Sequence, residues 1–198
     1  ADDLIHETYH NRLFALEERG PFFENESART DACHYSPWRS DPRPVFGVFH
    51  AFYVFTRVMR FWRLVYVDLI ASDAAADREH IRYATQRLLE LLGQLSEART
   101  TLRTANGLTP WGAEVFAAME AEFELERNRV EALGLPDDMP VFTVAEDGRY
   151  VPQAADTASR PFSVKESLRS HREAFDRLMH TAQARSSLKA DQATASSK

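Results

Sequence analysis

Two histidines four residues apart form the most distinctive chemical pattern in the chain. The pentapeptide His6-Glu7-Thr8-Tyr9-His10 has the form HExxH and lies where apolar residues recur at helical spacing. Residues i and i+4 share one face of a helix, so both imidazoles can bind one metal ion at ~2.1 Å. Glu7 directly follows the first histidine and can contact a metal-bound water. The pattern predicts metal ligands at His6 and His10 and a proton-handling role for Glu7.

A metal held by two histidines needs a third protein ligand, and the residues leave its identity open. His50 is the first candidate, because it lies among apolar and aromatic residues where an unpaired imidazole is costly. A core histidine bonded to a carbonyl or a tyrosine is its structural alternative. His34, in the loop beside Tyr35, is the rival histidine. Four glutamates are also available, although none lies in a helical pattern that directs it back to the pair: Glu17, Glu18, Glu24 and Glu26.

Three further segments extend the pattern, namely YSPWRSDPRP at 35–44, GVFHAFYVF at 47–55 and LTPWG at 108–112. Together with the HExxH motif they resemble the HExxH-domain peptide-modification proteins, which occur beside gene clusters for ribosomally made peptide natural products. The resemblance covers roughly residues 3 to 133. It implies an enzyme that uses iron(II) and 2-oxoglutarate to hydroxylate a β-carbon of a precursor peptide. His6 and His10 would be its metal ligands, and His50 matches a histidine that the family places after the proline-rich stretch.

Such an oxygenase also needs a cation for the far carboxylate of 2-oxoglutarate, and arginine binds a carboxylate through two parallel hydrogen bonds. Arg39 and Arg43 lie in the loop before the second helix, and Arg57 lies ~10 Å along that helix from His50. We expect the cosubstrate site to draw on these three arginines, each of which could instead form a salt bridge. Tyr35 and Trp38 are expected to line the substrate pocket, with a place in the core as their alternative.

Two other functions remain open at the level of the sequence. A zinc metallopeptidase would use Glu7 as a general base, although the usual third-ligand patterns of such enzymes are missing. A non-catalytic helical module that binds a peptide or a partner enzyme is the third hypothesis. The family normally carries a segment before HExxH, so we expect the C-terminal portion of a longer protein, or a site completed by another chain. The sequence does not decide whether the chain forms a homo-oligomer.

Helical periodicity dominates the elements that must position these residues. The pattern predicts a mainly α fold of about five helices, with an irregular stretch at 20–43 and a small β-hairpin at 141–151 that turns on Asp147-Gly148. Residues 1–184 are expected to form a single helical metal-binding domain, and 185–198 a disordered tail. The predicted helices cover 3–19, 44–71, 77–104, 110–133 and 163–184.

The composition of the chain restricts the classes of binding partner and the cellular compartment that we expect. The chain has 198 residues and a net charge of −6, which gives no basic excess to hold a nucleic acid. Its single cysteine, Cys33, is typical of a reducing compartment and predicts a cytoplasmic protein. The apolar stretch at 44–70 contains three arginines, so we interpret it as a buried helix rather than a membrane span.

Overall fold

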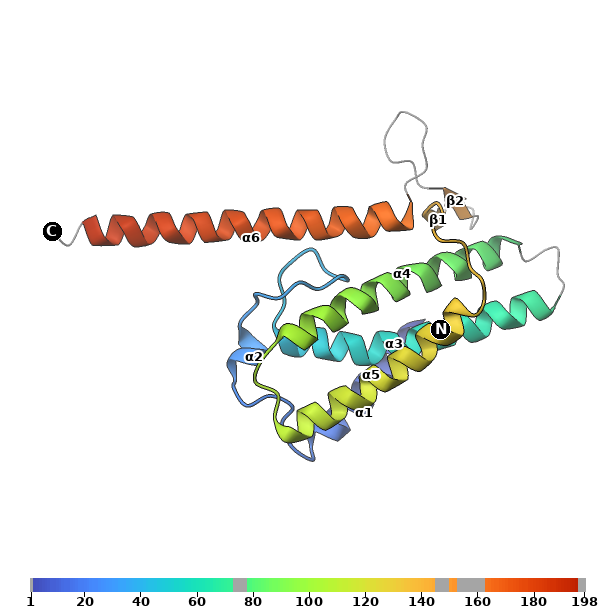
Figure 1. Cartoon of the computed structure of the whole chain (residues 1–198), viewed down its shortest axis with the longest axis horizontal. Helices are drawn as coiled ribbons and strands as arrows, with labels where there is room; N and C mark the ends of the chain where they lie inside the picture. The colour runs from blue at the N-terminus through green and yellow to red at the C-terminus, as the bar shows by residue number, and fades with distance from the viewer. Residues whose placement is uncertain (1, 73–77, 145–149, 153–162, 196–198) are drawn as a thin grey trace.

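The computed structural model describes residues 2–72, 78–144, 150–152 and 163–195, and within them the protein is mainly helical, as predicted (Figure 1). A two-stranded antiparallel sheet is also present, and its strands pair Thr143 with Val151. The elements are α1 (Asp2–Glu17), α2 (Ser27–Thr30), α3 (Val45–Ala71), α4 (Arg78–Thr104), α5 (Pro110–Glu131), β1 (Phe142–Val144), β2 (Tyr150–Pro152) and α6 (Val164–Ala195).

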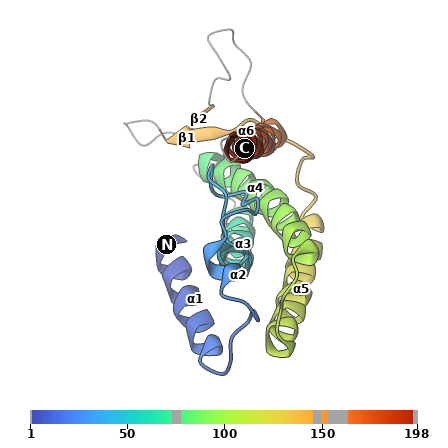
Figure 2. The ribbon, with the colours of Figure 1, turned by 90° about the vertical axis from the view of Figure 1, so that its left-hand side faces the viewer.

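Helix α3 is the centre of the molecule. Figure 2 shows α1 and α5 on either side of α3, and α4 packs along α3 while α6 contacts α4 near Gly93 and Glu97. The α3 sequence is apolar around most of its circumference, which is the pattern of a helix surrounded by others. Phe49, Phe52 and Met59 are fully buried in the core that it forms with its neighbours. Side chains placed on α3 are therefore held by packing on several sides.

The LTPWG segment has a structural role at the start of α5. The Thr109 hydroxyl accepts a hydrogen bond from Gly112 N at 2.9 Å and donates one to Pro21 O at 2.7 Å. Trp111 Nε1 donates to Leu16 O at 3.2 Å, so the segment also fixes the end of α1. A Cβ on Gly112 would lie 2.0 Å from Phe22 O, and only glycine permits that approach.

The boundaries differ from the sequence prediction in three places. Helix α1 ends at Glu17 rather than near residue 19, and the short helix α2 was not predicted. Helix α6 continues to Ala195, which corrects the predicted helix end near residue 184; it contains no glycine or proline that would stop it. The predicted Asp147-Gly148 turn lies outside the described residues. None of the helices in the described ranges has an apolar stretch long enough to cross a bilayer.

Candidate functional site

The structure brings the three histidines proposed as ligands to one cavity of about 520 Å³. His6 and His10 reach it from α1, and His50 reaches it from α3. The Nε2 atoms of His6 and His10 are 3.0 Å apart, and the ring of His10 stacks on that of His50 with centroids at 5.7 Å. Two helices that are separate in sequence thus bring three imidazoles to one cavity.

The His6–His10 pair fits the spacing of two ligands on one metal ion. Ligands at ~2.1 Å are ~3.0 Å apart in adjacent octahedral positions and ~3.4 Å apart in tetrahedral ones. The observed 3.0 Å between the two Nε2 atoms agrees with the former. Within the described residues, no group of three or more His, Cys, Asp or Glu side chains has the arrangement of a complete metal site. The same 3.0 Å is the length of a hydrogen bond between the two rings, and His50 is the further imidazole that lines the cavity.

His50 is held in the neutral form. Its side chain is only 5% exposed, and its Nε2 atom has no hydrogen-bond partner among the described residues. Burial, followed by the charges of His10 and Arg29, lowers the pKa of His50 to about 4. Burial and the neighbouring His6 also lower the pKa of His10. A neutral imidazole with a free ring nitrogen is the form that binds a metal.

Aromatic rings close the cavity around these histidines. Trp38 stacks on Phe55 with centroids 4.6 Å apart and planes within 10°, and Phe55 in turn meets the edge of His6 at 5.2 Å. Phe46 and Phe14 pack against His50 at 4.3 and 5.1 Å. Trp38 lies where the sequence predicted it, in the wall of the site. The rings of Phe46 and Phe14 contribute to the burial that lowers the pKa of His50.

Two of the three predicted arginines line the cavity of the histidines, and the third does not. Arg39 and Arg43 line the cavity, and their Nε atoms lie 3.3 and 3.5 Å from the carboxylate of Asp41. Arg57 is not brought to it: its guanidinium pairs with Glu122 of α5 and borders a separate cavity of about 330 Å³. Arg57 lies on α3 as predicted, but its guanidinium pairs with Glu122 on the neighbouring helix α5 and does not reach the cavity of the histidines.

Two other predicted residues also lie outside this cavity. Glu7 is exposed and is not among the described residues that line the site. Tyr35 is buried against α6, where its hydroxyl lies 3.0 Å from His171 Nδ1 and its ring meets Phe175 at 5.1 Å. Tyr35 therefore anchors the loop that carries Trp38 and does not form the pocket wall.

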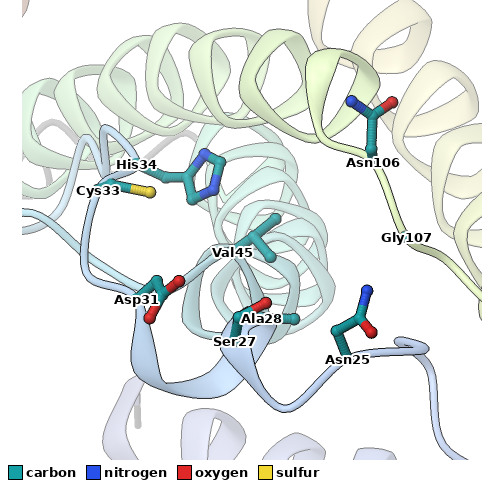
Figure 3. Close-up of a pocket in the computed structure, with 9 residues that line it drawn as sticks. All are labelled: Asn25, Ser27, Ala28, Asp31, Cys33, His34, Val45, Asn106 and Gly107. Atoms are coloured by element: carbon teal, nitrogen blue, oxygen red, sulfur yellow. The ribbon is translucent and has the colours of Figure 1, made fainter.

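The rival third ligand, His34, belongs to a different and smaller cavity of about 130 Å³. Figure 3 shows its imidazole beside Cys33, with Asp31 and Asn106 across the same hollow. The backbone of His34 pairs with that of Arg43, which fixes the loop in this orientation. Among the histidines weighed for the third position, the structure therefore places only His50 beside the pair.

Among the arginines that line the main cavity, Arg29 is the one that the sequence reasoning missed. It lies on α2, pairs with Glu17 and stacks over the ring of Phe46, with 3.8 Å between Cζ and the ring centroid. Helical periodicity cannot identify a helix of four residues, so the sequence held no signal that would have placed this arginine.

No family model matches this chain, and no curated protein gives a significant match to it.

Proposed function

We propose that this protein is a metal-dependent hydroxylase of a ribosomally made precursor peptide, with iron(II) and 2-oxoglutarate as its cofactors. The observation that carries the proposal is the convergence of His6, His10 and His50 on one cavity that arginines also line. Three protein ligands leave coordination positions for a keto acid and oxygen, as in mononuclear iron oxygenases. The sequence resemblance supports the same chemistry and supplies the class of substrate.

Each element of the cavity has a part in this chemistry. The iron and 2-oxoglutarate, when bound, would supply the oxidation in which oxygen inserts into a substrate C–H bond while the cosubstrate becomes succinate and CO₂. The histidines hold the metal, and an arginine binds the free carboxylate of the cosubstrate. Trp38 and Phe55 keep water away from the reacting carbon.

The position of Glu7 favours a hydroxylase over a zinc metallopeptidase. A peptidase of the HExxH type needs this carboxylate at the metal-bound water. Glu7 is instead exposed and does not line the cavity within the described part of the chain. The unpaired Cys33 supports a reducing, cytoplasmic setting, where precursor peptides are modified after translation.

The test combines metal analysis with turnover. The purified chain is loaded with iron(II) and incubated in air with 2-oxoglutarate and a candidate precursor peptide. We expect succinate and a peptide heavier by one oxygen atom. His50→Ala should abolish both products, and His34→Ala, at the separate cavity, should retain them. Absence of stoichiometric metal would favour a binding module. Peptide cleavage by a zinc-loaded chain, lost in Glu7→Gln, would favour a peptidase.

A further inference from the structure

Arg29 is close to the donor histidines. Its Cζ lies 3.8 Å from the centroid of Phe46, and the Phe46 ring lies 4.3 Å from that of His50. These two distances bound the separation between the guanidinium carbon and the His50 ring to about 8 Å. An extended five-carbon diacid spans roughly 5 Å between its carboxyl carbons, from standard bond lengths. The separation between the His50 ring and the Arg29 guanidinium carbon is thus at most a few ångströms longer than such a diacid.

Arg29 differs from the other two arginines of the cavity in how it is held. Arg39 and Arg43 share one exposed carboxylate, Asp41, and the Arg39 side chain is 58% exposed. The Arg29 guanidinium instead lies over the ring of Phe46, which also packs against His50. A guanidinium fixed on a ring loses less conformational entropy when it binds a carboxylate.

Arg29 already holds a carboxylate of the same molecule. Its partner, Glu17, is 17% exposed and lies on α1, seven residues after His10. Seven residues are two helical turns, so the two side chains share one face of α1 about 10 Å apart. Arg29 thus already pairs with a carboxylate that is carried by the same helix as His6 and His10.

We propose that Arg29 binds the far carboxylate of a dicarboxylate cosubstrate, and that Glu17 occupies Arg29 until this carboxylate displaces it. The inference rests on the proposed function, because it takes the near end of the diacid to be bound at the histidines. It assigns separate parts to the arginines: Arg29 selects the cosubstrate, whereas Arg39 and Arg43 line the same cavity and pair with Asp41.

Binding measurements without turnover test the assignment. The iron(II)-loaded chain is titrated anaerobically by calorimetry with 2-oxoglutarate and with 2-oxobutanoate, which has the same keto acid but lacks the far carboxylate. The wild type should prefer 2-oxoglutarate. Arg29→Gln should reduce this preference by about tenfold or more, the effect of a lost charged hydrogen bond, with 2-oxobutanoate binding unchanged. Arg39→Gln and Arg43→Gln are the matched controls and should keep the preference.

Glu17→Gln should change the affinity for 2-oxoglutarate in the opposite direction. Removing the internal carboxylate frees Arg29, so 2-oxoglutarate should bind more tightly while 2-oxobutanoate is unaffected. A purely structural ion pair would weaken the fold in both variants and change both ligands alike, and that result would overturn the inference. Arg29→Lys keeps the charge without the planar fork, should retain part of the preference, and decides the matter if Arg29→Gln does not fold.

The outcomes separate this inference from the function on which it rests. If the wild type binds neither iron(II) nor 2-oxoglutarate, the proposed function is wrong. If it binds both and Arg29→Gln keeps the full preference for the diacid, only the assignment of Arg29 is overturned. If Arg39→Gln or Arg43→Gln abolishes the preference instead, the carboxylate is bound by the arginines beside Asp41 and the inference is again wrong.

Discussion

Replacing His50 with leucine should stabilise the metal-free protein, and the gain should grow as the pH falls. The buried Nε2 of His50 has no partner among the described residues, and burying such a group costs about 1–3 kcal/mol. His50→Leu removes that cost and keeps an apolar side chain of similar size in the core. At pH 7.5 we expect the free energy of unfolding to rise by about 1 kcal/mol, after the loss of some packing.

The pH dependence follows from the lowered pKa. Burial, then the charges of His10 and Arg29, lowers the folded-state pKa of His50 to about 4, whereas the unfolded chain binds this proton near pH 6.5. The unfolded state therefore binds more protons between these values, and stability is lost as the pH falls through this window. Between pH 7.5 and 5.0 the loss from His50 amounts to about 2 kcal/mol.

Urea denaturation with a chelator present measures both effects. The advantage of His50→Leu should increase from about 1 kcal/mol at pH 7.5 to about 3 kcal/mol at pH 5.0. His180→Leu, at an exposed histidine on α6, is the control and should show the pH dependence of the wild type. An advantage of His50→Leu that does not change with pH would refute the lowered pKa. A loss of stability at pH 7.5 would show that Nε2 has a hydrogen-bond partner after all.

Three other predictions address the scaffold and the metal. Gly112→Ala should lower the free energy of unfolding by about 3 kcal/mol, because its Cβ would lie 2.0 Å from a backbone oxygen. Gly47→Ala, where no atom lies within 4 Å of the added Cβ, should instead stabilise α3 by up to about 1 kcal/mol, and thermal denaturation compares the two. Tyr35→Phe removes the 3.0 Å contact to His171, so hydrogen–deuterium exchange should become faster in residues 31–43. Zinc should raise the Tm of the wild type by several degrees, a gain that a chelator reverses and that is lost when both motif histidines are alanine. An equal gain in that double variant would place the metal elsewhere.

The sequence predicted those features that depend on local spacing. The long helices follow from apolar periodicity, and the HExxH spacing places His6 and His10 on one face of α1. The positions of three side chains could not be predicted, because each depends on a partner far away in the sequence. Arg57 pairs with Glu122 on α5, and Tyr35 packs against α6. Arg29 lines the cavity because it lies on the four-residue helix α2. Each of these outcomes depends on which carboxylate, ring or helix lies next to a side chain after folding.

The three histidines of the cavity lie on two helices, so the geometry of the site depends on how α1 packs against α3. His6 and His10 move with α1, which packs chiefly on α3, whereas His50 is fixed in the centre of the bundle. A tilt or a partial release of α1 separates the two halves of the donor set and leaves the core of α3, α4 and α5 intact. Under the proposed function, the affinity for a cation and the packing of α1 on α3 would therefore depend on one equilibrium.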